Sequence, residues 1–258
     1  MGVLDLFKLT GKTAIITGGG RGLGAQIAQG FAEAGIANIV LCSRNMEACR
    51  AVGEELEHAF GVRTLAVACD VTDPADIKAV VEKTLDAFGT IDILVNNSGA
   101  SWGAPVEQMP KEAWDKVIGI NVTGTFLMCQ EVGKVMMEKK SGKIINIASI
   151  AGFGGTPEFM QTIGYNTSKG AVMTFTKDLA VKWGRHNINV NAIAPGFFPT
   201  KMSNQLIELG REHILAATPL KRLGSEEDLK GAAVFLASQA SDYVSGGILT
   251  VDGGASAL

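Results

Sequence analysis

Short apolar runs alternate with longer stretches of helical spacing along almost the whole chain. The apolar runs predict buried strands at residues 13–17, 38–42, 64–69, 92–95, 143–148, 187–193 and 248–251. The longer stretches predict helices at residues 22–34, 46–60, 74–88, 111–139, 164–183 and 225–237. Because most of the runs are apolar throughout rather than at alternate positions, we expect parallel strands covered by helices on both faces.

Two of the predicted helices begin with capping signals. Asp73 precedes Pro74, which matches an N-cap followed by proline at the first helical position. Ser225 and Asp228 stand three residues apart and resemble a capping box. This second signal predicts that the last helix begins at Ser225.

The order of these elements predicts an α/β fold with a doubly wound parallel sheet of about seven strands. No linker-like stretch, low-complexity segment or internal repeat interrupts the pattern, so we expect a single domain over residues 1–258. In such sheets ligands bind beyond the carboxyl ends of the strands. The residues directly after each predicted strand are therefore the candidates for a functional site.

Composition and charge narrow the class of protein. Of the 258 residues, 47% are hydrophobic and 19% are charged, a globular composition that excludes intrinsic disorder. The formal net charge is −3 and no long basic run exists, so nucleic acid is not an expected partner. No secretory signal is visible, and no apolar stretch reaches the roughly 18 residues that span a bilayer. We expect a cytoplasmic protein with no membrane association.

The cysteines and histidines do not predict a metal site. Cys42, Cys49, Cys69 and Cys129 contain no C-x-x-C spacing, and the three histidines stand alone in the sequence. Because a tetrahedral zinc site needs clustered ligands, we expect no metal and mostly buried, reduced thiols.

A glycine-rich stretch follows the first predicted strand. Residues 17–24 are Thr-Gly-Gly-Gly-Arg-Gly-Leu-Gly and directly precede a predicted helix. Glycine permits a tight turn and lets the backbone approach a pyrophosphate, while the helix N-terminus adds unpaired N–H groups and a positive dipole end. Such loops also form ordinary turns, but a strand, a glycine loop and a helix in this order predict dinucleotide binding.

The end of the second predicted strand indicates which dinucleotide is bound. Residues 41–45 are Leu-Cys-Ser-Arg-Asn and lack the acidic residue that binds the ribose 2′-hydroxyl of NAD. Arg44 is placed to meet a 2′-phosphate, Ser43 can add a hydrogen bond, and Arg21 is a second basic residue. We therefore expect a preference for NADP(H); the alternative is that Arg44 only caps a surface turn.

Tyr165 and Lys169 stand four residues apart on a predicted helix and so share one face. A tyrosine has a pKa near 10, and a neighbouring ammonium favours the phenolate and lowers that pKa. The pair therefore suits general acid–base chemistry near neutral pH. Taken alone, a Tyr–Lys pair at this spacing is more often an ordinary helix surface.

The ordered motifs together resemble those of the short-chain dehydrogenase/reductase family over essentially the whole chain. Residues 17–24 match T-G-x-x-x-G-x-G, residues 96–99 (Asn-Asn-Ser-Gly) stand where the family usually has N-N-A-G, and residues 165–169 match Y-x-x-x-K. The other matches are Asp70-Val71, Asn121, Ser149, Pro195-Gly196 with Thr200, and Asp252-Gly253-Gly254. Alone, Asn96 and Asn97 could be only a turn after a strand.

The resemblance implies a Rossmann fold, with cofactor binding in about residues 1–150 and catalysis and substrate binding in about residues 149–258. It implies that Tyr165 is the acid–base group, that Lys169 holds the nicotinamide ribose and that Ser149 hydrogen-bonds the substrate oxygen. Asn121 would bend its helix and hold a water in a proton relay. The implied cofactor-binding residues are Gly18, Gly20, Arg21, Gly22, Leu23, Gly24, Ser43, Arg44, Asn45, Asp70, Val71, Asn97, Ser98, Gly99, Tyr165, Lys169, Pro195, Gly196, Phe198, Thr200 and Met202.

One departure from the family pattern lies between Ser149 and Tyr165. They are 16 residues apart, where the family more often has about a dozen, so the loop over the substrate is expected to be enlarged. We expect residues 152–164 and the segment from 197 to about 217 to form a mobile lid.

The substrate is predicted only as a class. The sequence resembles the branch that holds gluconate 5-dehydrogenases, 3-oxoacyl-carrier-protein reductases and the ketoreductase of rhamnolipid synthesis, so a sugar acid, an acyl thioester and a simple ketone all stay open. The candidate pocket residues are Ser98, Ser101, Trp102, Phe153, Pro157, Glu158, Phe159, Met160, Gln161, Phe197 and Phe198. The resemblance also implies a homotetramer or homodimer that pairs residues 111–139 and 164–183. A non-catalytic dinucleotide sensor of the same fold is the alternative, but Ser149, Tyr165 and Lys169 are all present.

Overall fold

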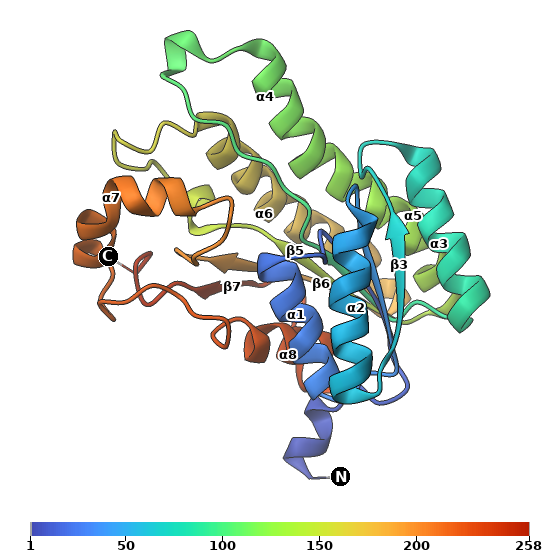
Figure 1. Cartoon of the computed structure of the whole chain (residues 1–258). Helices are drawn as coiled ribbons and strands as arrows, with labels where there is room; N and C mark the ends of the chain where they lie inside the picture. Colours follow the sequence, from blue (N-terminus) through green and yellow to red (C-terminus); the bar gives the residue numbers. More distant parts are fainter. Residues whose placement is uncertain (1, 258) are drawn as a thin grey trace.

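Seven parallel strands form one sheet in the computed structural model, which describes residues 2–257 (Figure 1). The strands are β1 (Thr13–Thr17), β2 (Asn38–Ser43), β3 (Arg63–Ala68), β4 (Ile93–Asn96), β5 (Gly142–Ile147), β6 (Ile188–Pro195) and β7 (Ile248–Val251). Their order is β3-β2-β1-β4-β5-β6-β7, so the direction of winding reverses between β1 and β4. The predicted α/β fold is confirmed, and each predicted strand is present with its ends shifted by two residues at most.

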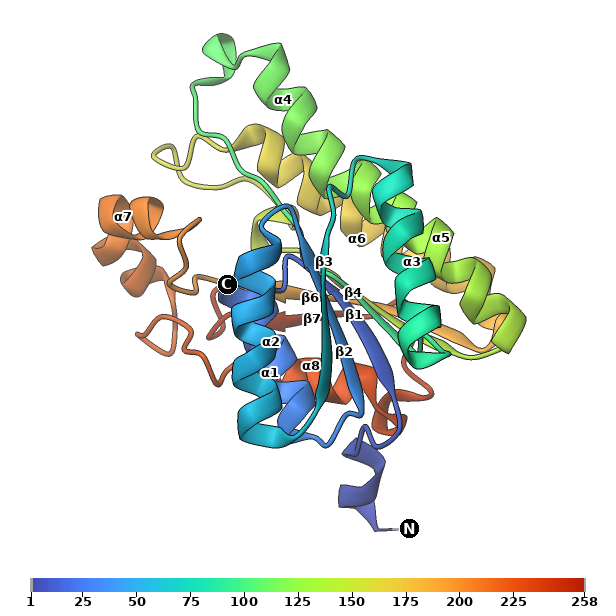
Figure 2. The same cartoon turned by 45° about the vertical axis from the view of Figure 1, so that its right-hand side comes forward.

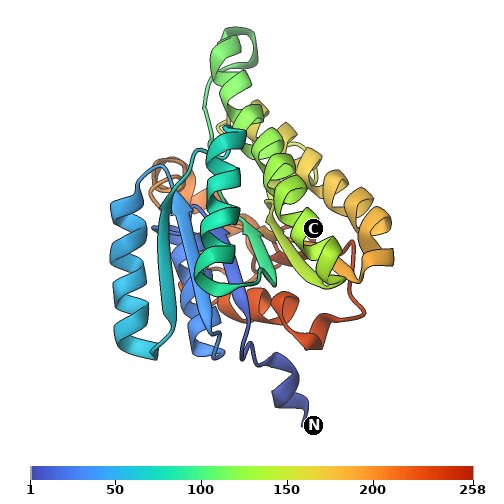
Figure 3. The same ribbon diagram turned by 90° about the vertical axis from the view of Figure 1, so that its right-hand side faces the viewer.

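Helices cover both faces of the sheet, as Figures 2 and 3 show. They are α1 (Gly22–Glu33), α2 (Met46–Phe60), α3 (Pro74–Phe88), α4 (Lys111–Ile118), α5 (Gly124–Lys139), α6 (Ile163–Trp183), α7 (Asn204–Ala217) and α8 (Lys230–Ala237). Residues of α1, α2 and α8 pack in one apolar cluster, and residues of α3, α5 and α6 pack in another. No helix within residues 2–257 is long and apolar enough to cross a membrane.

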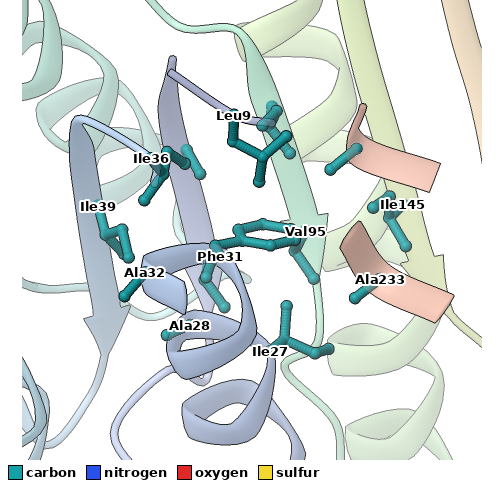
Figure 4. Close-up of a cluster of buried hydrophobic side chains, with 14 of the residues drawn as sticks. Leu9, Ile27, Ala28, Phe31, Ala32, Ile36, Ile39, Val95, Ile145 and Ala233 are labelled. Atoms are coloured by element: carbon teal, nitrogen blue, oxygen red, sulfur yellow. The ribbon is translucent and has the colours of Figure 1, made fainter. Parts of the chain in front are cut away.

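Alternate residues of β1, an interior strand of the sheet, belong to the two apolar clusters. Ala14 and Ile16 of β1 belong to the first cluster, whereas Ile15 between them belongs to the second. Phe31 of α1 is fully buried in the first cluster, among Leu9, Ile36 and their neighbours (Figure 4). This burial of both faces explains why β1 has apolar residues at consecutive positions rather than at alternate ones.

The predicted helix over residues 111–139 is interrupted. A π-helical turn, Gly119–Thr123, separates α4 from α5, and the N–H of Gly124 bonds to the carbonyl of Gly119. The turn contains Asn121, whose side chain bonds to two other segments of the chain. A π-turn of this kind often marks a functional position in a helix.

Two further predictions about helices were incomplete. The predicted bond between Ser225 and Asp228 is present, but the helix begins only at Lys230, because the backbone bonds before it, from Asp228 to Ser225 and from Lys230 to Glu227, have the three-residue spacing of turns. In addition, α7 was not among the predicted helices.

Replacing Phe31 with alanine is expected to destabilise the protein strongly. The ring is fully buried, so its removal leaves a cavity and lowers the free energy of unfolding by about 3–5 kcal/mol. Urea denaturation measures this change. Phe60, which is 43% exposed at the end of α2, is the matched control: Phe60→Ala is expected to change the free energy of unfolding by well under half as much. Equal losses in the two variants would contradict the assignment of Phe31 to the core.

Candidate functional site

A cavity of about 1100 Å³ opens at the carboxyl edge of the sheet. Its lining comes from the segments that follow β1, β2, β3, β4, β5 and β6, together with parts of α4, α6 and α7. Of the residues predicted to be catalytic or to bind a cofactor, all but Gly24 and Asn121 line this cavity. The fold therefore gathers into one place residues that are up to about 180 positions apart in the sequence.

The glycine loop between β1 and α1 is held tightly against its neighbours. The N–H of Gly18 donates to the carbonyl of Cys42 at 2.7 Å. Gly18 has φ +65°, a left-handed conformation that favours glycine, and a Cβ there would lie 2.8 Å from Nδ2 of Asn97. A Cβ on Gly24 would lie 2.5 Å from the carbonyl oxygen of Gly18. Gly24 therefore allows α1 to pack closely against the glycine loop, and it does not line the cavity.

Asn97 and Thr17 fasten the loop after β4 to the end of β1. Nδ2 of Asn97 donates to the carbonyls of Thr17 and Gly18, at 3.0 and 3.1 Å. The hydroxyl of Thr17 accepts from the backbone N–H groups of Asn97 and Ser98, at 3.0 and 2.9 Å. These bonds fix the position of the glycine loop relative to the centre of the site. Thr17 was not among the predicted site residues, although it is the first residue of the matched glycine motif.

Basic side chains line the cavity beyond β2. Arg44 and Arg21 are both exposed and line it. The hydroxyl of Ser43 accepts from the N–H of Asn45 and donates to its carbonyl, so Ser43 is already engaged within its own turn. The pKa of Asp70 is lowered, mainly by hydrogen bonds from Thr72, with a smaller contribution from the charge of Arg44. The guanidinium of Arg44, rather than the hydroxyl of Ser43, therefore offers hydrogen-bond donors to a ligand at this end of the cavity.

Lys169 extends from α6 into the centre of the site, where it is 5% exposed. Its Nζ donates to the carbonyl of Ile147, the last residue of β5, at 2.6 Å. It lies 5.5 Å from the centre of the Tyr165 ring. Burial of the ammonium lowers the pKa of Lys169 to about 8. Lys169 is therefore a cation at neutral pH whose pKa lies only slightly above that pH.

Tyr165 differs in one respect from the sequence prediction. Burial raises the pKa of Tyr165 above 10, and this outweighs the opposing effect of the Ser149 hydroxyl. The expectation that Lys169 would lower this pKa was therefore wrong for this structure, because desolvation of the phenolate dominates. Ser149 itself is 9% exposed, and its Oγ accepts from the N–H of Ala151 at 3.2 Å. Tyr165 consequently holds its proton near neutral pH and is suited to donate it.

Asn121 makes structural contacts and does not line the cavity. Its Oδ1 accepts from the N–H of Ala100 at 2.8 Å, and its Nδ2 donates to the carbonyl of Ala100 at 2.9 Å and to Oγ of Ser168 at 2.8 Å. Ser168 in turn donates to the carbonyl of Tyr165 at 2.7 Å. Asn121 therefore joins the loop after β4 to α6 and positions both; a water held by this residue stays a prediction.

The segment after β6 closes the side of the site next to the glycine loop. A Cβ on Gly22 would lie 3.5 Å from Cγ2 of Thr200. The hydroxyls of Thr200 and Ser203 are 3.0 Å apart. Phe198, predicted to bind the cofactor, is only 4% exposed and packs in the first apolar cluster, with its ring against Gly224. The ring of Phe198 therefore packs mainly in the apolar core and only partly lines the cavity.

Two segments cover the opposite wall of the cavity, namely residues 150–162 and α7. In Figures 1 and 2 the yellow segment before α6 lies beside α7. Of the predicted pocket residues, Glu158, Phe159 and Gln161 do not line the cavity, whereas Ser98, Ser101, Trp102, Phe153, Pro157, Met160, Phe197 and Phe198 do. Sequence reasoning missed His213 and Lys201, which also line it. The predicted mobility of these segments stays a prediction.

Comparison with known proteins gives matches over nearly the whole chain. A family model described as enoyl-(acyl carrier protein) reductase matches residues 18–256. The 5-keto-D-gluconate 5-reductase of Escherichia coli is 40% identical over 252 residues, 97% of each chain. The 3-oxoacyl-[acyl-carrier-protein] reductase of Chlamydia trachomatis is 40% identical over 246 residues, 95% of this chain and 98% of its own. A crystal structure of a gluconate 5-dehydrogenase from Burkholderia cenocepacia in complex with NADP and tartrate is 36% identical, with a TM-score of 0.93 over 100% of both chains.

Replacing Lys169 with methionine is expected to stabilise the protein. The pKa of this side chain is about 8 when folded, against an ordinary value of 10.5, so the unfolded chain binds the proton more tightly. The charge therefore lowers stability below pH 8, and the penalty fades as the pH rises towards 10.5. The variant also loses the hydrogen bond to the carbonyl of Ile147, which costs about 1 kcal/mol at any pH. Lys169→Met should therefore raise the free energy of unfolding by up to about 2 kcal/mol at pH 7, and by about 2 kcal/mol less at pH 9.5.

Urea denaturation at the two pH values measures both changes. Lys177→Met is the matched control, because Lys177 is exposed on the same helix. A gain that was the same at both pH values, or that also occurred in the control, would contradict a buried cation at Lys169.

Proposed function

This chain belongs to the short-chain dehydrogenase/reductase family, and we propose that it is an NADP(H)-dependent oxidoreductase that interconverts a ketone or aldehyde with the matching alcohol. The observation that carries this proposal is the arrangement of Tyr165, Lys169 and Ser149 around one cavity that also reaches the glycine loop. The named relatives and neighbours above are reductases and dehydrogenases.

The residues of the cavity fit a phosphorylated dinucleotide. Gly18 and Gly22, with φ +65° and +54°, leave the backbone open at the N-terminus of the 12-residue helix α1, where N–H groups favour an anion. No acidic residue ends β2, and Arg44 and Arg21 are free to meet a 2′-phosphate. Asp70 and Val71 would contact the adenine, and Asn97, Ser98 and Gly99 would lie along the ribose.

The site chemistry suits carbonyl reduction. When bound, the nicotinamide would supply the hydride. Tyr165 keeps its proton because its hydroxyl is buried, and so it acts as the general acid towards the carbonyl oxygen. Ser149 would hydrogen-bond the same oxygen and stabilise the charge that develops on it. Lys169, fixed by the carbonyl of Ile147, would hold the nicotinamide ribose and place a positive charge beside the phenol.

The proposed assembly into a homotetramer or homodimer follows from family membership alone. Phe126 of α5 is 44% exposed and Val181 of α6 is 83% exposed. Apolar side chains on these two helices are consistent with their expected pairing between subunits. Cytoplasmic location is a proposal of the same kind.

Replacing Tyr165 with phenylalanine is expected to abolish turnover and leave NADPH binding intact, because only the proton donor is lost. NADPH oxidation with a panel of ketones measures turnover, and quenching of protein fluorescence measures binding. Ser149→Ala should lower kcat by about 10²–10³-fold, the usual cost of losing one such donor. Tyr243, the other tyrosine of the chain, is fully exposed, and Tyr243→Phe is the control. If Tyr165→Phe kept activity within a few-fold of the unmodified protein, the acid would have to be another group.

Replacing Arg44 with aspartate is expected to reverse the cofactor preference. One hydrogen bond to a charged group corresponds to about 10- to 150-fold in binding, so the unmodified protein should prefer NADPH over NADH by at least about 10-fold in kcat/KM. Arg44→Asp should remove that preference and improve the use of NADH. Arg50, paired with Glu47 on the exposed side of α2, gives the control Arg50→Asp. Equal efficiency of both cofactors in the unmodified protein would exclude Arg44 from this role.

A further inference from the structure

One face of α7 forms part of the cavity wall, and His213 is the only polar side chain that the helix contributes to it. Leu206, His213, Ile214 and Ala217 line the cavity. Their spacing of seven, one and three residues places them on a single helical face. The other three are apolar, so the imidazole is an isolated hydrogen-bonding group on an apolar wall.

The imidazole of His213 is held by an aromatic contact. The ring of Phe159 meets it edge-to-face, with centroids 5.4 Å apart and an interplanar angle of 78°. Phe159 fits this position because α7 has a glycine beneath it: a Cβ on Gly210 would lie 2.2 Å from the phenyl ring. The helix kinks at the same residue, with φ −122° and ψ 18°. Phe159 therefore orients His213 without lining the cavity itself.

The ring nitrogens of His213 are free to bind a ligand. His213 is an exposed side chain, and within residues 2–257 neither ring nitrogen has a hydrogen-bond partner among the protein atoms. The donor of the imidazole is thus available to a molecule in the cavity.

The charges of the cavity favour an anion. The lining has five basic side chains, Arg21, Arg44, Lys116, Lys169 and Lys201, of which only Lys169 is buried, and Asp70 is its only carboxylate within the described residues. Asp70 lies near Arg44, at the end assigned to the adenine. Lys201 and His213 come from the segment after β6, where no acidic residue lines the cavity. Arg21, Arg44 and Lys169 are assigned to the cofactor, so Lys116 and Lys201 are the cations of the lining that remain to attract an anionic substrate.

We propose that His213 is a specificity-determining residue that binds the carboxylate of an oxo-acid substrate, and that Phe159 positions it. The inference rests on the proposed reductase function and narrows its substrate to a small anionic carbonyl compound. Lys201 adds favourable charge from the same segment. Because His213 comes from α7, whereas Tyr165 comes from α6 and Ser149 from the segment after β5, it would contact a part of the substrate away from the reacting carbonyl. Its loss should therefore raise KM more than it lowers kcat.

The first test compares oxo acids with neutral partners of the same shape. A set of γ-, δ- and ε-oxo acids, with and without hydroxyl groups, is assayed beside the corresponding methyl esters by NADPH oxidation. At least one acid is expected to exceed its ester by about 10-fold or more in kcat/KM. If esters are reduced as well as or better than acids throughout, the inference is overturned and the proposed reductase function stands. If no member of the set oxidises NADPH, both the function and the inference are overturned.

The second test assigns the preference to His213. His213→Leu is expected to lower kcat/KM for the preferred acid by about 10- to 150-fold, mainly through KM, and to change that of its ester by less than about 3-fold. His213→Gln keeps a donor and should recover part of the loss. Phe159→Leu should reduce the acid-to-ester ratio by a smaller factor. His58→Gln, at an exposed position of α2, is the control and should leave the ratio unchanged.

Two further measurements separate recognition from folding. Thermal unfolding and NADPH binding are expected to be the same in His213→Leu as in the unmodified protein. If His213→Leu lowers the unfolding temperature, His213→Gln is the variant that tests the inference. The inference is overturned if His213→Gln leaves the acid-to-ester ratio of kcat/KM unchanged and His213→Leu lowers kcat/KM equally for the acid and its ester. A selective loss on the acid in either variant supports it.

Discussion

Parallel pairing of all seven strands brings their carboxyl ends to one edge of the sheet, and the site depends on that constraint. The reversal of winding between β1 and β4 separates the two connections at this edge and leaves room for a ligand. Thr17, Asn97, Ser149 and Pro195 each stand at or just after the end of a strand. They are therefore neighbours at this edge although the chain separates them widely, and Asn97, Ser149 and Pro195 line the cavity.

Hydrogen bonds then join the loops at this edge to one another and to α6. Thr17 and Asn97 tie the loop after β4 to the glycine loop, Asn121 ties the same loop to α6, and Lys169 ties α6 to the end of β5. Buried hydrogen bonds of this kind are costly to break because the partner left behind is unsatisfied. The opposite wall, made by α7 and the segment before α6, is joined mainly by apolar contacts such as Phe159 on Gly210. The residues proposed for catalysis thus lie at the sheet edge and on α6, and the residue proposed for specificity lies on α7.

Burial acts in opposite directions on the two central titratable groups. It raises the pKa of Tyr165 and lowers the pKa of Lys169 to about 8, because the charged form of each group is the one that loses solvation. The phenol therefore keeps a proton to donate. The ammonium lies near its deprotonation point, at a cost to stability that a neutral side chain would not carry.

The sequence alone determined the α/β class, the seven strands and the motif order, and nearly all the catalytic and cofactor residues that it predicted line the cavity, because each of these depends on local pattern or on position after a strand. It did not determine the start of α8, since the backbone bonds before the helix have the three-residue spacing of turns. Nor did it place Asn121 behind the site or reverse the expected pKa shift of Tyr165, because both follow from three-dimensional packing. The role proposed for His213 also depends on the tertiary structure. Only the folding of α7 against Phe159 brings that isolated histidine to the cavity wall, and no spacing in the sequence encodes a contact between residues 54 positions apart.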